Sequence, residues 1–182
     1  VQPGQIVAGV GGAYDEAQQR ELDAAREAFG EAQTAPWKPL GLDLATLVGL
    51  RAEVFHLEDA WDAQNRGIGV AALADRDVRG AAVLLHTGWD RLFGTPDYAV
   101  GSPYLTADAT RWLIEQGATL VGIDALNIDD TESGGERPAH TLLLGAGIHV
   151  VEHLTRLGDV PEQGARFTAA PPAFEGFGTF PV

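Results

Sequence analysis

The stretch TADATRWLIEQGATLVGID, residues 106–124, decides the fold. Its first half predicts a helix, because Thr106 can cap the start, apolar side chains line one side, and Gly117 can end it. Its second half, ATLVGID, predicts a buried strand. Upstream, residues 81–85 form a continuously apolar run bounded by turn residues, which is typical of a strand covered on both faces. This strand, helix, strand order predicts an α/β, or mixed α+β, layered domain.

Further elements are predicted on both sides of this stretch. RAEVFHL, residues 51–57, predicts a strand, and residues 71–79 predict a short helix. After a polar loop, residues 140–145 predict a short helix or turn, and residues 147–152 a strand that continues briefly. The N-terminal part adds a mostly polar helix at 15–29. The tail, rich in proline and glycine, predicts a segment that wraps the surface or a last edge strand.

Composition bounds the class of protein. With 182 residues, 45% of them hydrophobic and 21% charged, the chain predicts a single globular domain. The formal net charge of −14 opposes binding to nucleic acid and to anionic membrane faces. No apolar run approaches the roughly 20 residues that cross a bilayer, so we expect a soluble, cytoplasmic protein. The absence of cysteine leaves any metal site to His, Asp and Glu.

Three motifs carry a resemblance to a known family. They are the TGW segment at residues 87–89, the VGID segment at residues 121–124, and His140, which is followed by a leucine-rich turn and, twelve positions later, by Glu152. In this order and spacing, the chain from about residue 47 onward resembles the cyclase family of metal-dependent hydrolases, which includes kynurenine formamidase and isatin hydrolase. The resemblance implies the family's swivelling β/β/α fold, a small-molecule substrate and a homo-oligomer.

The same resemblance implies that His140 and Glu152 are catalytic groups and metal ligands. Imidazole and carboxylate suit the Zn²⁺ or Mn²⁺ ion that the family uses. From the residues alone, a capping or surface histidine beside a loop is the favoured interpretation of His140, whereas Glu152 follows an apolar run, where a carboxylate is costly to bury unless it is paired. Trp89 and His86 are the candidates for substrate binding, with core packing as the alternative for both.

Other polar residues have two interpretations. Three of them follow the buried strand and either orient ligands by hydrogen bonds or form Asx turns: Asp124, Asn127 and Asp129. The string HVVEH looks like a metal site, yet His149 and His153 would share one face of a strand and Glu152 the other. This alternation argues against a cluster of all three.

The family's N-terminal metal motif, HxGTHxDxPxH, is not recognisable here. The nearest counterpart keeps a glycine and a proline, but Ala28, Ala32 and Thr34 hold the ligand positions, and Lys38 replaces the last histidine. An alanine methyl group cannot bind a cation. Residues 1–45 therefore stand outside the resemblance. Three explanations remain open. The chain is a family member that lost its metal chemistry, a member that rebuilt its metal site with other residues, or a sequence whose first segment is altered by truncation or a reading-frame error.

The leading functional hypothesis is a metal-dependent hydrolase of a non-peptide C–N bond, in a formamide or lactam, of the arylformamidase type. In that chemistry the ion lowers the pKa of bound water, and a histidine shuttles the proton. One alternative is a catalytically silent homologue that binds a ligand or assembles with a partner. Another is a metal-independent cyclase or isomerase with Lys38, Glu31 or His86 as acid–base groups.

Overall fold

The computed structural model of the chain describes residues 46–169, which lie within one compact unit. The helix predicted at 15–29, the motif counterpart that ends at Lys38 and the proline-rich tail lie outside these residues. Within the described range, no helix is both long and apolar enough to cross a membrane.

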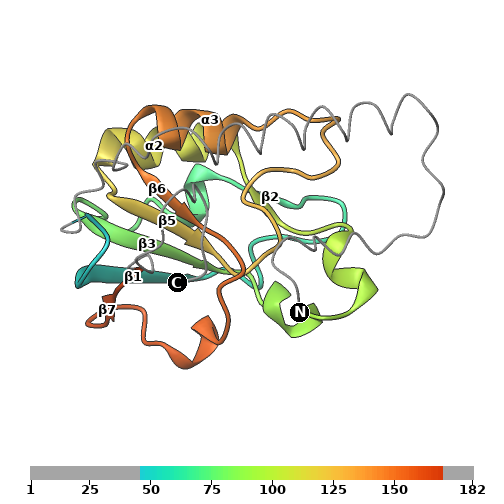
Figure 1. Cartoon of the computed structure of the whole chain (residues 1–182), viewed down its shortest axis with the longest axis horizontal. Coiled ribbons are helices and arrows are strands. Elements are labelled where there is room, and N and C mark those ends of the chain that lie inside the picture. The colour runs from blue at the N-terminus through green and yellow to red at the C-terminus, as the bar shows by residue number, and fades with distance from the viewer. Residues whose placement is uncertain (1–45, 170–182) are drawn as a thin grey trace, which may run out of the picture. The chain divides into compact units, whose positions relative to one another are not determined.

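A five-stranded sheet organises the described residues (Figure 1). Its order is β6-β5-β3-β1-β7; the first four strands run parallel, and β7 pairs antiparallel with β1. The strand bounds are β1 Leu50–His56, β3 Ala81–His86, β5 Leu120–Ile123, β6 His149–Val151 and β7 Arg166–Phe167. A small second sheet pairs β2 (Gly67–Ile68) with β4 (Tyr104–Leu105) in parallel. The predicted mixed α/β layering is confirmed.

Two α-helices, α2 (Ala107–Gln116) and α3 (Pro138–Gly145), lie on one face of the large sheet (Figure 1). α2 begins and ends as predicted: the Thr106 hydroxyl accepts a hydrogen bond from Ala109 N at 3.3 Å, and Gly117 ends the helix with a left-handed φ of 80°. The helix predicted at 140–145 is confirmed and starts earlier, at Pro138. Proline suits a first helical position because its missing N–H has no partner there anyway.

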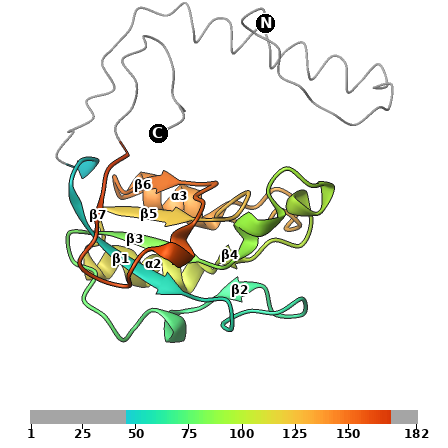
Figure 2. The ribbon, with the colours of Figure 1, turned by 90° about the horizontal axis from the view of Figure 1, so that it is seen from below.

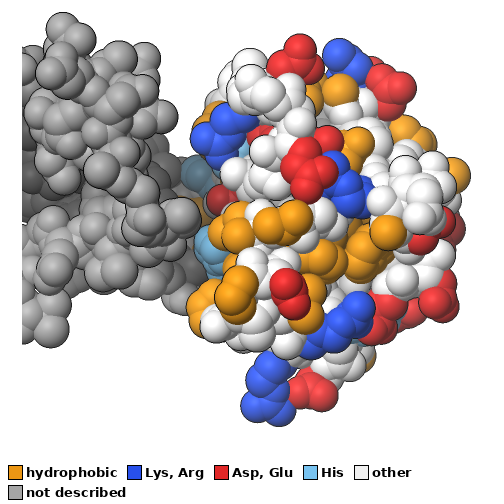
Figure 3. Space-filling view, turned by 90° about the vertical axis from the view of Figure 1, so that its right-hand side faces the viewer, with side chains coloured by type: hydrophobic (Ala, Val, Ile, Leu, Met, Phe, Trp, Pro, Cys, Tyr) orange, Lys and Arg blue, Asp and Glu red, His pale blue; other side chains and the backbone are white. Residues whose placement is uncertain are grey.

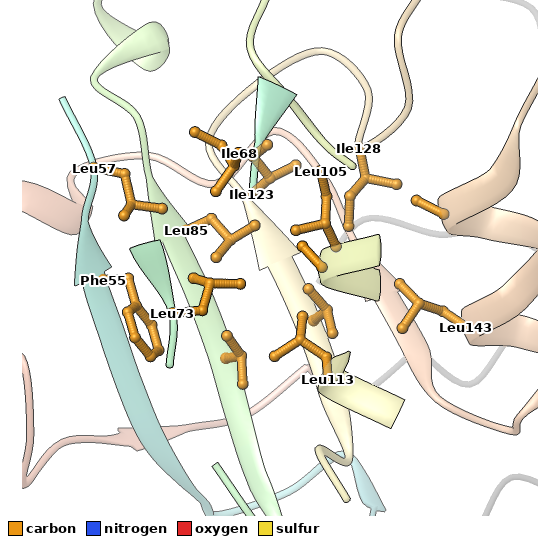
Figure 4. Packing of buried hydrophobic residues seen from close by; sticks show 14 of the residues in the cluster. Phe55, Leu57, Ile68, Leu73, Leu85, Leu105, Leu113, Ile123, Ile128 and Leu143 are labelled. Carbon is orange, nitrogen blue, oxygen red and sulfur yellow. The ribbon is translucent and has the colours of Figure 1, made fainter. Parts of the chain in front are cut away.

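Two hydrophobic clusters fill the space on either side of the sheet. The larger one joins the strands to both helices and includes the residues labelled in Figure 4, among them Phe55, Leu85, Ile123, Leu113 and Leu143. The second fills the opposite face, where Leu157 of the short 3-10 turn η5 (Leu157–Asp159) packs onto the strands. All six residues of β3 are buried between the clusters, as predicted for a strand covered on both faces. Figure 2 shows η5 and the sheet from below.

The helix predicted at 71–79 is wrong. Only a 3-10 turn forms, η2 (Val70–Ala72), and beyond it the Asp77 carboxylate accepts a hydrogen bond from Arg79 N at 3.0 Å in a turn. The fully buried apolar residues of this stretch are Leu73 and Val78. These two residues are five positions apart, and two side chains at that separation do not lie on the same face of an α-helix.

The strand predicted at 147–152 is confirmed only as the short β6, which ends at Val151. The expected continuation is replaced by a turn, in which His153 and Arg156 have left-handed φ values of 58° and 59°. A left-handed residue reverses the local direction of the chain. Glu152 and His153 are therefore free to project toward different neighbours, which matters for the site.

Candidate functional site

The carboxyl ends of the parallel strands gather the polar residues of the site. β1 ends at His56 and β3 at His86, while Asp124 and Glu152 directly follow β5 and β6. The carboxyl ends of adjacent parallel strands meet at one edge of a sheet, where ligands of α/β proteins commonly bind. On the face seen in Figure 3, histidine atoms reach the surface among acidic, basic and apolar side chains.

Asp129 holds His140 at the start of α3. Its buried carboxylate accepts a hydrogen bond from Ala139 N at 2.6 Å, one from His140 N at 3.2 Å, and one from His140 Nδ1 at 2.6 Å. It therefore caps a helix whose own N-cap residue, Arg137, makes no side-chain cap bond. Because a carboxylate accepts, we infer that Nδ1 carries the proton and that the lone pair lies on Nε2, which is 3.3 Å from Arg137 Nη2.

Glu152 lies opposite that lone pair. His140 Nε2 is 3.6 Å from Glu152 Oε1, which also accepts a hydrogen bond from Ile128 N at 2.8 Å. The two residues that the sequence analysis paired thus meet in space, because α3 returns the chain to β6, which runs parallel beside β5. We call His140, Asp129 and Glu152 the His140 triad. Their chemical roles remain predictions.

A cavity of about 280 Å³ adjoins the triad. It is lined by the loop that connects β5 to α3, including Asn127, Asp129, Asp130, Glu136 and Arg137. Arg137 Nη2 lies 3.2 Å from His140 Nδ1 and 3.3 Å from His140 Nε2, and the arginine side chain is half exposed. The cavity wall therefore carries several carboxylates and a guanidinium group beside the imidazole of the triad.

His56 and His86 form a second imidazole group, which we call the histidine pair. Their Nδ1 atoms are 2.9 Å apart, and their rings meet edge to face at 89°. Glu58 Oε2 lies 3.8 Å from His86 Nδ1. His86 itself is buried, and Gly158 of η5 packs so closely on it that a β-carbon at Gly158 would lie 3.1 Å from His86 Cε1. Substrate binding by His86 remains a prediction.

Asp124 anchors the TGW segment. Its carboxylate accepts hydrogen bonds from Thr87 N at 2.9 Å, Thr87 Oγ1 at 2.5 Å and Gly88 N at 2.8 Å. Burial raises the pKa of Asp124, against the effect of these hydrogen bonds and of the nearby His86, which favour the charged form. Asp124, His86 and Asp90 are the one set of three potential metal-ligand residues within 46–169 whose ligand atoms all lie within 4.8 Å of one another.

The Tyr98 hydroxyl lies near His153 and near several carboxylates of the site, which affect its pKa. Its hydroxyl lies 3.0 Å from His153 Nδ1. Burial, followed by the negative charges of Asp124, Asp90 and Glu152, raises the pKa of Tyr98 to about 12. The phenol is therefore protonated at neutral pH and can donate a hydrogen bond at the carboxyl end of the sheet.

Trp89 lies in the hydrophobic core. Its side chain is 8% exposed, its indole Nε1–H donates a hydrogen bond to the Tyr98 carbonyl at 3.0 Å, and its ring meets Trp61 edge to face. Its assignment to substrate binding stays a prediction, with little surface left for a ligand. The two outer histidines of HVVEH have other partners than Glu152: His149 pairs with the Thr46 hydroxyl at 2.9 Å, and His153 with Tyr98.

Sequence reasoning did not single out three residues of this region: His56, Tyr98 and Arg137. A signal existed for His56, because it ends a predicted strand just as His86 ends another, and parallel pairing brings such ends together. No local signal identifies Tyr98, whose hydrogen-bond partner lies 55 positions later in the chain. Asp129 was considered as a residue that orients ligands, but its capping of α3 depends on a loop return that no spacing rule predicts.

One family model and several solved structures of metal-dependent hydrolases match this chain. The family model Cyclase, described as "Putative cyclase", matches residues 21–130. A solved structure described as a potential metal-dependent hydrolase with cyclase activity is 30% identical, with a TM-score of 0.61, over 84% of this chain and 70% of that chain. Isatin hydrolase A from Labrenzia aggregata, solved with benzyl benzoate, is 27% identical, with a TM-score of 0.66, over 74% of this chain and 59% of its own.

A structure described as a predicted metal-dependent hydrolase from Bacillus stearothermophilus is 28% identical, with a TM-score of 0.57, over 80% of this chain and 64% of its own. The chain thus spans less than two thirds of that protein and of isatin hydrolase A. No curated protein sequence matches the chain. The family match starts at residue 21, so it includes part of the segment that the sequence motifs left outside the resemblance.

Proposed function

The chain belongs to the cyclase family, and from this premise we propose that it is a metal-dependent hydrolase that cleaves a C–N bond in a formamide or lactam. Its fold is close to the folds of metal-dependent hydrolases, among them isatin hydrolase A. One fold supports several chemistries, so family membership does not by itself fix the reaction. The observation that carries the proposal is the meeting of His140, Asp129 and Glu152.

The donor atoms of the triad suit a divalent ion. Ligands of Zn²⁺ lie about 2.0–2.2 Å from the metal, so neighbouring ligand atoms come about 3.0–3.6 Å apart. His140 Nε2 and Glu152 Oε1, separated by 3.6 Å, meet this condition. Asp129 supplies the hydrogen bond to Nδ1 that metal-binding imidazoles usually make. His140 and Glu152 would therefore hold the Zn²⁺ or Mn²⁺ ion that the resemblance implies.

Residues 1–45 contain neither histidine nor cysteine. This composition is the main difference from the family's imidazole-rich motif.

The residues of the triad and of the cavity wall have separate roles in the proposed reaction. A bound ion of this kind lowers the pKa of water and polarises a carbonyl group. Asp129 would keep His140 in the tautomer whose Nε2 lone pair faces the ion. The Glu152 oxygen that does not bind the ion would accept the proton of the attacking water and pass it to the leaving nitrogen as the C–N bond breaks. Arg137, at the cavity wall, pairs with a negatively charged or carbonyl group of the substrate.

Hydrolysis of an arylformamide, with and without added Mn²⁺ or Zn²⁺, tests the proposal. We expect turnover that depends on the metal and that falls by about 100-fold or more in His140→Ala and Glu152→Gln, the usual range for losing an acid–base group. His149→Ala is the matched control, because it removes an imidazole that pairs with Thr46. Turnover that is indifferent to the metal and to both triad variants would reject the assignment.

A catalytically silent homologue is the second candidate, and Arg137 is the observation that favours it. Its Nη2 lies 3.3 Å from His140 Nε2, so a fixed positive charge stands beside the proposed ligand. Elemental analysis of the purified protein separates the two candidates. Metal content that falls by one equivalent in His140→Ala supports the hydrolase, whereas a folded protein whose metal content is the same with and without His140 supports the silent homologue.

Three finer points belong to the proposal: an arylformamide-like substrate, Zn²⁺ or Mn²⁺ as the ion, and a homo-oligomeric assembly. A small-molecule substrate is supported by isatin hydrolase A, which was solved with benzyl benzoate. The cavity beside the triad, at about 280 Å³, is slightly smaller than the pockets that hold drug-sized ligands. Sedimentation velocity at several protein concentrations would measure the assembly state.

A further inference from the structure

We propose that the histidine pair, together with Glu58, is a second transition-metal site, separate from the His140 triad. The starting observation is the distance of 2.9 Å between His56 Nδ1 and His86 Nδ1. Only one proton fits between two nitrogen atoms this close, so in the neutral pair one Nδ1 presents a lone pair to the other. Two imidazole nitrogens bound to one tetrahedral Zn²⁺ ion lie about 3.3 Å apart. An ion that replaces the shared proton would therefore need the two nitrogens to separate by only a few tenths of an ångström.

The fold holds both histidines in place. β1 and β3 run parallel, and in their register His56 is the direct partner of His86. Gly158 covers the far edge of the His86 ring, where a β-carbon would lie 3.3 Å from Nε2. His86 is consequently left with Nδ1 as the nitrogen that faces His56 and Glu58. His56 is exposed, so an ion can reach the pair from solvent.

Glu58 supplies a third ligand. Its Oε2 lies 3.8 Å from His86 Nδ1, and its side chain is 52% exposed, so the carboxylate has room to turn toward an ion at the pair. Two imidazoles and one carboxylate form a ligand set found in catalytic zinc sites, and they also suit Co²⁺ and Ni²⁺. The remaining coordination positions would be open to water.

Local charge favours a cation at this place. Besides Glu58, the carboxylates of Asp90 and Asp124 each bring an oxygen within 4.8 Å of a His86 nitrogen. Arg91 is a neighbouring cation, whose Nη1 is 3.9 Å from Glu58 Oε1 and whose side chain is 61% exposed. Carboxylates thus outnumber guanidinium groups around the histidine pair, which attracts a divalent ion. Asp124 is not counted as a ligand, because its oxygens already accept hydrogen bonds from Thr87 and Gly88.

Metal titration of the full chain tests the site. The background is the double variant His140→Gln with Glu152→Gln, which lacks the metal site of the proposed hydrolase. We expect this protein to bind one equivalent of Zn²⁺ by calorimetry, and Co²⁺ to give visible d–d absorption that Zn²⁺ displaces. Adding His56→Gln should weaken binding at least tenfold, and adding Glu58→Gln should weaken it less. Lowering the pH below 6 should also weaken it, because protons compete for the imidazoles.

His149→Gln, in the same background, is the matched control and should leave the affinity unchanged. Variants of His56 are preferred to variants of buried His86, because replacing an exposed side chain leaves the core intact. The proposal is overturned if the double variant binds neither Zn²⁺ nor Co²⁺, or if His56→Gln and His149→Gln bind equally well. Neither result bears on the hydrolase, because the triad is absent from every protein in this series.

Discussion

Replacing Asp129 with asparagine tests how the His140 triad is built. In the native side chain, Oδ1 accepts the hydrogen bond from Ala139 N, and Oδ2 accepts the proton of His140 Nδ1. Asparagine keeps one oxygen and replaces the other with an NH₂ group, which cannot accept. With the oxygen retained at the helix cap, the NH₂ group faces His140 Nδ1. Nδ1 must then become the acceptor, and the imidazole proton moves to Nε2.

The magnitude of the effect follows from these contacts. A protonated Nε2 no longer offers a lone pair toward Glu152, and changing the hydrogen-bond partner of a metal-binding histidine typically costs about 10–100-fold in metal affinity. The lost charge-assisted hydrogen bond is worth about 1.5–3 kcal/mol, part of which the reversed tautomer regains. We therefore expect Asp129→Asn to lower the free energy of unfolding by about 1–2 kcal/mol.

Two assays read these effects separately. Long-range ¹H–¹⁵N NMR reports the tautomer of His140, and calorimetry reports Zn²⁺ affinity, in chains that carry His56→Gln to remove the second site. Asp108→Asn is the control, since Asp108 is 87% exposed and pairs with Arg111 on the surface of α2, where such pairs contribute little. An unchanged tautomer and unchanged affinity, with only the stability reduced, would refute the reasoning and leave Asp129 as a helix cap alone.

Three further perturbations test the packing and the electrostatics. Gly122→Ala should lower the free energy of unfolding by about 1–3 kcal/mol, because a β-carbon there would lie 2.6 Å from Leu154 Cδ1; in urea denaturation Leu154→Ala should offset part of that loss, and strict additivity would contradict the clash. The pKa of Tyr98, about 12 when folded against 10.0 for the free side chain, means that the unfolded chain loses this proton first. Stability should therefore fall as the pH rises from 10 towards 12, by at most about 2.7 kcal/mol, and Tyr98→Phe should flatten that part of the curve. Thr106→Ala should cost about 1 kcal/mol through loss of the α2 cap, and Thr106→Ser, which keeps the hydroxyl, should cost much less in the same thermal denaturation experiment.

Elements with strong local signals were predictable. α2 is bounded by Thr106 and Gly117, each of which acts through its own backbone neighbours, and β3 is an apolar run that needs no partner to be identified. The helix predicted at residues 71–79 does not form, because the tertiary core buries Leu73 and Val78, whose spacing does not fit one helix face.

The candidate site also has some residues that the sequence predicted and others that it did not. The ordered motifs identified His140 and Glu152 as a pair, and the fold brings His140 Nε2 to 3.6 Å from Glu152 Oε1. What surrounds them could not be derived, because Asp129 reaches His140 through a folded-back loop and Arg137 stands beside the ring only once α3 has formed. Hydrogen bonds of this kind depend on distances between segments, and a linear sequence contains no distances.

By itself, the amino-acid sequence determined the layered α/β class, the family, and the candidate imidazole and carboxylate of the triad, because these depend on residue type, periodicity and order along the chain. Only the tertiary structure decided that Trp89 packs in the core, that Asp124 anchors the TGW segment, and that His56 and His86 meet at the ends of neighbouring strands. The physical reason is that burial, tautomer and charge are properties of an environment, and parallel strands build that environment from segments far apart in the sequence.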